Sequence, residues 1–287
     1  MSEFRKNVTV ITGTGGIGLA IARTLALNTH LVLADDSPSQ LDAAAQILRD
    51  EGHTVTTHAT DVSDWKSVQS LAETAAQVDG PIATIVHTAG VSPVQAPPAR
   101  IYEVDLLGTA HVIDAFLPVV AAGATLTVIA SMAGHHVAGK LSAEFETHLA
   151  TAPVSSLLSH PQLESSGFDR SDPAKAQTMT AGAYCTSKRG NILRVQAAAR
   201  AWGLKGARIN SVSPGVIDTP MSRMEAERGA GAHIQKLVDE SPMHRKGTAS
   251  DIAGMVAFLA SPAASFLTGS DYLVDGGSVA VRRWGSE

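Results

Sequence analysis

The sequence has almost no cysteine, no block of like charges and no long apolar run. One cysteine among 287 residues excludes an internal disulfide and a cysteine-based metal cluster, and the scattered histidines predict no metal site. The net charge is −5, without basic blocks or interleaved aromatic residues, which argues against a nucleic-acid or anionic-membrane surface. Neither a signal peptide nor an apolar run of about 20 residues, the length of a membrane span, is found. We therefore expect a cytoplasmic protein.

The sequence does contain a regular alternation of short apolar strands and amphipathic helices. The predicted strands are β-branched with little polar alternation, which is typical of parallel strands covered on both faces. They are Val8–Thr12, His30–Ala34, Thr54–Ala59, Ile82–Thr88, Thr125–Ala130, Ala207–Val212 and Tyr272–Val274. The predicted helices are Ile17–Leu27, Pro38–Glu51, Asp64–Val78, Ile101–Ala121, Ala181–Trp202 and Ala249–Ala260. This order predicts one α/β domain over residues 1–287, a doubly wound parallel sheet between two helical layers.

The first predicted strand ends in a glycine-rich turn, TGTGGIG, and a helix follows it. Glycine is needed where the turn is tight and where backbone N–H groups approach a pyrophosphate closely. The amino end of the following helix adds a partial positive charge facing that anion. A plain strand-to-helix turn is the alternative, but the position after the first strand favours dinucleotide binding.

The end of the second strand, LVLADDS, predicts which dinucleotide is bound. An acidic side chain there accepts hydrogen bonds from the adenosine ribose and repels a 2′-phosphate. One charge pair at about 4 Å and an effective dielectric of about 20 is worth about 4 kcal/mol, and no arginine or lysine lies at this point of the sequence. NAD is therefore predicted over NADP, with Asp35 as the contact, while Asp36 could be a helix cap. Asp61 and Val62 could contact the adenine, unless Asp61 or Ser63 caps the next helix.

Seven short motifs, in order along nearly the whole chain, make the sequence similar to the short-chain dehydrogenase/reductase family. They are TGTGGIG, DVSD, HTAG, IASMAG, YCTSK, NSVSPGVIDTP and TGSDYLVDGG. The resemblance implies a Rossmann-type fold with seven parallel strands and hydride transfer between a nicotinamide and an alcohol or carbonyl. It also implies a homotetramer or homodimer that uses the last strand, and a catalytic set of Ser131, Tyr184 and Lys188.

Tyr184 and Lys188 stand four positions apart on one predicted helix, so their side chains are neighbours. A free phenol has a pKa of about 10 and is a poor base at neutral pH. A nearby ammonium would lower that pKa by about 3 units, before desolvation reverses part of the effect. We therefore predict that Tyr184 exchanges the substrate proton and that Ser131 holds the substrate oxygen. By resemblance, Lys188 also binds the nicotinamide ribose. An interface tyrosine and an ordinary surface lysine are the alternative.

The chain departs from the family pattern at several places. Its glycine motif is one residue shorter than usual. The asparagine of the extended catalytic set falls on Asp105, which could accept the same hydrogen bonds, would add charge, and could be only structural. Ser131 and Tyr184 are separated by a much longer interval than the family's short loop. His135 and His136 lie close to Ser131, but no carboxylate is placed by the sequence to orient them, so we expect surface or pocket-lining histidines.

The residues and the resemblance together predict a cofactor site along the carboxyl edge of the sheet. The predicted contacts are Gly13, Gly16, Ile17, Gly18, Asp35, Asp61, Val62, Ala89, Gly90, Tyr184, Lys188, Pro214, Gly215, Ile217 and Thr219. The resemblance implies that Pro214, Gly215 and Ile217 meet the nicotinamide and that the Ile217 amide pairs with its carboxamide. Thr219 would reach the carboxamide or the diphosphate. A plain strand-to-helix loop is the alternative for this segment.

Residues 136–180 interrupt the alternation before the Tyr184 helix. Connections of this length are normally functional or carry structure of their own. We predict a substrate lid that shapes an apolar pocket with Met221 and Met224, or alternatively an oligomer contact. Leucines and a phenylalanine at helical spacing support structure within the segment: Leu141, Phe145 and Leu149, then Leu157, Leu158 and Leu163.

The sequence therefore predicts an NAD-preferring dehydrogenase or reductase for a secondary alcohol or ketone. Two alternatives stay open. One is a non-catalytic dinucleotide sensor or binding protein on the same scaffold, because a fold does not fix a function. The other is the same chemistry with NADP.

Overall fold

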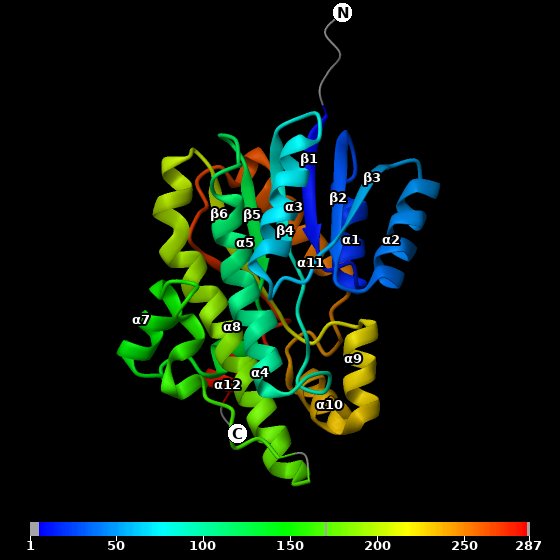
Figure 1. Ribbon diagram of the computed structural model, residues 1–287. Helices are drawn as coiled ribbons and strands as arrows, with labels where there is room; N and C mark the ends of the chain where they lie inside the picture. The colour runs from blue at the N-terminus through cyan, green and yellow to red at the C-terminus, as the bar shows by residue number, and fades with distance from the viewer. Residues whose placement is uncertain (1–5, 170, 286–287) are drawn as a thin grey trace, which may run out of the picture.

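The computed structural model describes residues 6–169 and 171–285 (Figure 1). Seven parallel strands form one sheet in the order β3-β2-β1-β4-β5-β6-β7. The strands are β1 (Asn7–Thr12), β2 (Thr29–Asp35), β3 (Thr54–Ala59), β4 (Ile82–His87), β5 (Thr125–Ile129), β6 (Arg208–Pro214) and β7 (Asp271–Val274). The predicted doubly wound sheet is confirmed, because the strand order reverses direction between β1 and β4.

Helices cover both faces of this sheet. The α-helices are α1 (Gly16–Leu25), α2 (Pro38–Asp50), α3 (Trp65–Gln77), α4 (Pro98–Ile101), α5 (Gly108–Phe116), α6 (Ala133–His136), α7 (Ala143–Thr151), α8 (Pro173–Leu204), α9 (Pro220–Glu225), α10 (Gly231–Glu240), α11 (Ala249–Ala260) and α12 (Ser278–Trp284). The π-helical turns are η1 (Tyr102–Leu107) and η4 (Ala226–Ala230), and the 3₁₀ turns are η2 (Leu157–Ser159), η3 (Pro161–Leu163) and η5 (Pro262–Ala264). No helix in the described part of the chain is long and apolar enough to cross a membrane.

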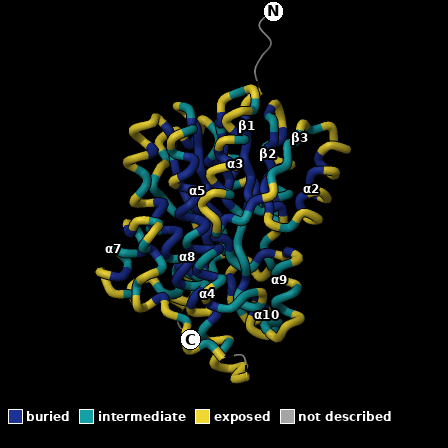
Figure 2. The backbone as a smooth tube through the Cα atoms, in the orientation of Figure 1, coloured by how far each residue is buried: buried dark blue, intermediate teal, exposed yellow. Residues whose placement is uncertain are grey.

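The core lies in two apolar clusters, one on each side of the sheet, and Figure 2 shows β1 and β2 as largely buried and β3, at the edge, as less so. Ile21 of α1 and Ile252 of α11 pack on one face with residues of α2. Leu71, Phe116 and Trp202, from α3, α5 and α8, pack on the other face. Burying one such side chain contributes about 1.5–3 kcal/mol. The predicted three-layer α/β/α arrangement is therefore confirmed.

Helix ends follow local signals where the sequence carries them. Ser37 caps α2, with Pro38 in the first turn, and Thr248 with Asp251 forms a capping box at the start of α11. Helix α8 begins eight residues earlier than expected, because Asp172 caps it. Helices α9, α10 and α12 were not among the predicted elements.

The long helix predicted over residues 101–121 is broken in its middle by the π-turn η1. The Gly108 N–H bonds the Glu103 carbonyl, one residue further back than in an α-helix. Such single π-turns are frequent at functional sites. Asp105 lies in this turn and is completely buried.

The insertion at residues 136–180 is folded against the rest of the chain. The predicted amphipathic helix is confirmed as α7, which lies beside α8 (Figure 1). Phe145, Leu149, Leu157 and Leu163 are buried in a third apolar cluster with residues of η1 and α8. The expected boundary at Thr180 is wrong, since residues 173–180 already belong to α8.

Two arginines of α8 fix the insertion. Arg194 donates to the carbonyl oxygens of Leu149 at 3.2 Å and Ala152 at 3.0 Å, at the carboxyl end of α7. Arg189 Nη2 lies 2.7 Å from Glu146 Oε1. These contacts fix the inserted segment against α8. The role of the insertion as a substrate lid stays a prediction.

Candidate active site

The glycine-rich turn after β1 is packed too closely for side chains. Gly13 has a φ of +81°, and a Cβ there would lie 2.6 Å from the Ala89 nitrogen. A Cβ on Gly18 would overlap the Gly13 carbonyl oxygen. The turn therefore lies directly against the HTAG segment after β4. Ligands bind at this edge in open α/β sheets, at the point where the strand order reverses.

The start of α1 offers free N–H donors. Its N-cap, Gly15, provides no side-chain hydrogen bond to the first turn. Gly16, Ile17 and Gly18 form that turn, and an uncapped helix amino end is a site for an anion. The missing Cβ atoms and these donors fit the diphosphate of a dinucleotide.

Asp35 is tied to the glycine-rich turn. Its Oδ2 accepts the Thr14 N–H at 2.6 Å and the Thr14 hydroxyl at 2.8 Å, and its Oδ1 accepts the Ser37 N–H at 3.0 Å. The side chain is buried, whereas neighbouring Asp36 is exposed. Because Ser37 caps α2, the capping alternative for Asp36 is wrong. The Thr14–Asp35 contact was missed by the sequence analysis.

Asp61 lies beside an arginine that the sequence analysis also missed. Its Oδ1 accepts the Ser63 N–H at 2.9 Å, and its Oδ2 lies 3.0 Å from Arg100 Nη2. Asp64 caps α3, so the capping alternatives for Asp61 and Ser63 are wrong. Partial desolvation raises the pKa of Asp36, the charges of Asp35 and Asp61 raise it further, and Arg100 opposes them. Several acidic groups and one arginine thus surround the predicted ribose position.

Ser131 and Tyr184 meet despite the long interval between them. Helix α6 follows Ser131 and packs against α8, where a Cβ on Gly134 would lie 2.8 Å from the Lys188 carbonyl carbon. This close approach brings Ser131 next to the Tyr184 phenol, close enough to lower its pKa. Ser131 Oγ also accepts the Ala133 N–H at 3.1 Å. Its own hydroxyl proton can therefore be directed at a substrate oxygen.

Lys188 points into the protein. Its side chain is buried, with Nζ 5.5 Å from the centroid of the Tyr184 ring and 3.7 Å from Asp105 Oδ2. A Cβ on Gly90 would lie 3.3 Å from the same Nζ, so the HTAG backbone borders this group. The surface-lysine alternative is therefore wrong. The structure brings Asp105, Tyr184, Lys188 and Gly90 together, as the motif order predicts.

The predicted lowering of the Tyr184 pKa is wrong for this structure. Burial raises the pKa of Tyr184 above the ordinary phenol value, and the charge of Asp105 raises it further. The nearby Ser131 hydroxyl acts in the opposite direction. The main physical reason is the burial of the phenol; in addition, Lys188 lies beside the Asp105 carboxylate, which offsets the field that its ammonium exerts on the phenol.

The predicted nicotinamide loop follows β6. The Gly215 N–H donates to the Val274 carbonyl at 3.0 Å, and a Cβ on Gly215 would lie 2.6 Å from the Asp275 Cα. Ile217 is bridged to Gly247. Pro214 ends β6 at the same sheet edge as Ser131. The loop is therefore held by the end of β7 on one side and by Gly247 on the other.

Thr219 and Val62 have structural roles in this arrangement. Thr219 caps α9, where its hydroxyl accepts the Ser222 N–H at 3.2 Å. Val62 is buried, and its carbonyl oxygen lies 2.9 Å from His111 Nδ1.

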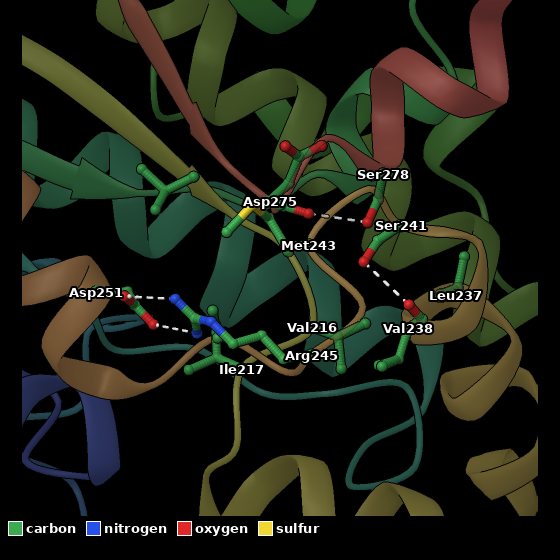
Figure 3. A pocket seen from close by; sticks show the side chains of 14 residues that line it. Val216, Ile217, Leu237, Val238, Ser241, Met243, Arg245, Asp251, Asp275 and Ser278 are labelled. Atoms are coloured by element: carbon green, nitrogen blue, oxygen red, sulfur yellow. Dashed lines mark hydrogen bonds and ion pairs between the residues drawn. The ribbon is translucent and has the colours of Figure 1, made fainter. Parts of the chain in front are cut away.

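A cavity of about 100 Å³ lies beside the predicted nicotinamide loop, between Ile217 and Val238 of α10 (Figure 3).

His135 is oriented by a carboxylate after all. Its Nε2 lies 2.7 Å from Asp271 Oδ2, and Asp271 Oδ1 accepts the hydroxyls of Ser211 at 2.6 Å and Ser213 at 2.9 Å. This contact ties α6, next to Ser131, to β7. The partner was missed because it lies on the last strand. Burial and nearby positive charge lower the pKa of His136 to about 4.

Comparison with known proteins agrees with this geometry. Residues 6–143 match the family model described as short chain dehydrogenase, and residues 171–279 match the model described as enoyl-(acyl carrier protein) reductase. The chain is 36% identical to short-chain dehydrogenase/reductase bsc3 of Alternaria brassicicola, over 94% of this chain and 95% of the relative. It is 32% identical to cis-4-hydroxycyclohexanecarboxylate dehydrogenase of Sinomonas cyclohexanicum, over 97% and 98% respectively.

A solved structure supports the same conclusion. The short-chain dehydrogenase/reductase (glucose/ribitol dehydrogenase) from Brucella melitensis is 28% identical, with a TM-score of 0.71 over 96% of this chain and 98% of that chain. Fold and site thus define an NAD(P)-dependent oxidoreductase that acts on alcohols or carbonyls. The chain belongs to the short-chain dehydrogenase/reductase family.

Proposed function

We propose that this enzyme transfers a hydride between NAD(H) and a secondary alcohol or ketone, with Ser131, Tyr184 and Lys188 acting around the substrate oxygen. One observation carries the proposal: Ser131, just before α6, lies next to Tyr184 and the buried Lys188 of α8. A nicotinamide supplies or takes the hydride when it is bound. The chain supplies the groups that hold the oxygen and move its proton.

In the reductive direction, the Ser131 hydroxyl donates a hydrogen bond to the carbonyl oxygen, which can only accept, while the Ser131 oxygen accepts the Ala133 N–H. As hydride reaches the carbonyl carbon, Tyr184 transfers its phenol proton to the oxygen. The phenolate is left beside the Lys188 ammonium until solvent returns a proton. Alcohol oxidation follows the reverse path, with phenolate as the base.

We propose that Asp36, rather than Asp35, binds the adenosine ribose. Both Asp35 oxygens already accept hydrogen bonds from the chain, while the Asp36 carboxylate is exposed beside them. Arg100 does not convert this place into a phosphate site, because Asp61 at 3.0 Å and Glu103 at 3.4 Å balance its charge. This arrangement supports NAD over NADP.

Asp36→Asn is expected to reduce the preference for NAD over NADP by about tenfold or more, because it removes the charge that repels the 2′-phosphate. The measurement is kcat/KM for each cofactor with one substrate. Asp42→Asn, which removes an exposed acid from the following helix α2, is the control and keeps the wild-type ratio. An unchanged ratio in the Asp36 variant would remove the support for this assignment.

The substrate test is a panel of cyclic and linear ketones with NADH, and of the matching alcohols with NAD. The Sinomonas relative is named for a cyclic secondary alcohol, so we begin the panel with substituted cyclohexanols and cyclohexanones. Turnover of secondary alcohols or ketones supports the proposal. Tight NADH binding without turnover of any member would favour the sensor alternative.

We also propose that the chain forms a homotetramer or homodimer through the edge of the sheet at β7. Leu273 on this strand is 41% exposed, nearby Phe266 is 100% exposed, and Trp284 of α12 is 75% exposed. Large apolar side chains left in water near an open sheet edge are typical of an interface. Sedimentation velocity should show a dimer or tetramer, and Phe266→Asp should lower the assembled fraction. A wild-type monomer at micromolar concentration would contradict this proposal.

A further inference from the structure

A carboxylate is buried directly behind the catalytic pair. Asp105 is 0% exposed, and its Oδ1 accepts the Val91 N–H at 2.8 Å. Its Oδ2 lies 3.7 Å from Lys188 Nζ and has no hydrogen-bond partner among the residues that the structure describes. A neutral amide would fill the same space and keep the Val91 contact. The consequence of an aspartate here is therefore its charge.

One cation balances the negative charge of Asp105. Lys188, from α8, is the only cation acting on Asp105 within the described chain. His87, from β4, is neutral, because burial and then Lys188 lower its pKa to about 3. Tyr184 also faces Glu225 and Cys185, both of which raise its pKa rather than lower it.

The order of ionisation follows from these positions. A carboxyl group ordinarily ionises about 6 pH units below a phenol. Burial raises the pKa of Asp105, and Lys188 partly offsets this rise. Because the Lys188 ammonium lies 3.7 Å from Asp105 Oδ2 and favours its charged form, Asp105 becomes negative before Tyr184 does. Forming the phenolate then places a second anion against a single ammonium that Asp105 already balances.

We propose that Asp105 is a positioning residue that opposes ionisation of Tyr184, so that the site works at neutral pH as a proton donor to a carbonyl. In this scheme the alcohol is oxidised efficiently only under alkaline conditions. The inference rests on the proposed function and adds to it the direction in which the site is tuned.

The test is the pH dependence of kcat/KM in both directions for wild type and Asp105→Asn. The variant removes the negative charge, so the acid limb of alcohol oxidation should move to lower pH by about one unit, which is about tenfold faster oxidation at neutral pH. Ketone reduction at neutral pH should change much less than alcohol oxidation, because the phenol is already protonated. Superimposed profiles, or a shift to higher pH, would overturn the proposal.

A second measurement does not need turnover. The chain has three tyrosines, so the phenolate absorbance of Tyr184 can be isolated by subtracting the titration of Tyr184→Phe. In Asp105→Asn, and in Asp105→Ser as a second neutral variant, this absorbance should form at lower pH than in wild type. Asp114→Asn is the matched control, since Asp114 faces Arg194 and His111 rather than Lys188.

These two measurements separate the two proposals. If no alcohol or ketone is turned over, the proposed function fails, and the phenolate titration still decides the role of Asp105. If turnover is found but neither neutral variant moves the Tyr184 titration, Asp105 is only structural and the inference is wrong.

Discussion

Tyr184→Phe is expected to lower turnover by about 10³-fold while NADH still binds. The substitution removes the one hydroxyl that exchanges the substrate proton, and positioned general acid–base groups contribute about 10²–10⁴-fold to rate. The ring stays, so the packing of α8 against the insertion is kept. The measurements are kcat with the best ketone of the panel and the NADH dissociation constant by fluorescence titration.

The control is Tyr272→Phe, which removes a hydroxyl from the edge strand β7. It should retain wild-type kcat within about twofold, because it removes one hydroxyl from a half-buried ring outside the catalytic set and keeps the ring in place. Near-normal turnover by the Tyr184 variant would show that another group moves the proton. Loss of NADH binding together with turnover would instead point to damage of the fold, which circular dichroism would reveal.

Gly18→Val should weaken cofactor binding by about 100-fold while leaving a folded chain. A Cβ at this position overlaps the Gly13 carbonyl oxygen, so the glycine-rich turn has to move. The turn is pinned to β2 by Thr14 and Asp35, which leaves it little room to adjust. Overpacking of this kind costs about 1–3 kcal/mol, and a loss of about 2.7 kcal/mol is about 100-fold in the dissociation constant.

Calorimetric titration with NADH measures this effect directly. The matched variant is Gly203→Val in α8, where an added Cβ would meet no atom within 4 Å. Its affinity for NADH should equal that of wild type. Unaltered NADH affinity in the Gly18 variant would mean that the dinucleotide does not lie on this turn.

The sheet and its order of elements could be predicted because each strand carries its own signal. Runs such as Val8–Thr12 are apolar and β-branched, and burial on both faces of a parallel sheet requires that composition. Caps such as Ser37 and Thr248 are equally local. Helix α9 was missed because it is only six residues long, and α10 was missed because no capping side chain marks its start.

The positions of the site residues could be predicted from the sequence, but several of the contacts that these residues make could not be predicted. Arg100 meets Asp61, and His135 meets Asp271, only after the chain has folded, since these partners lie far apart in sequence. Spacing on one helix placed Lys188 near Tyr184. It could not show how deeply the phenol is buried or that the ammonium turns towards Asp105 on a third element, and these two features are why the predicted direction of the phenol pKa was wrong.

Isotope transfer tests the central claim most directly. The enzyme would be incubated with a ketone that it reduces and with NADH carrying two deuterium atoms at C4 of the nicotinamide, and the product alcohol analysed by mass spectrometry and NMR. The account predicts one deuterium on the carbinol carbon of every product molecule and none on its hydroxyl. A product alcohol without deuterium at that carbon would contradict hydride transfer at this site.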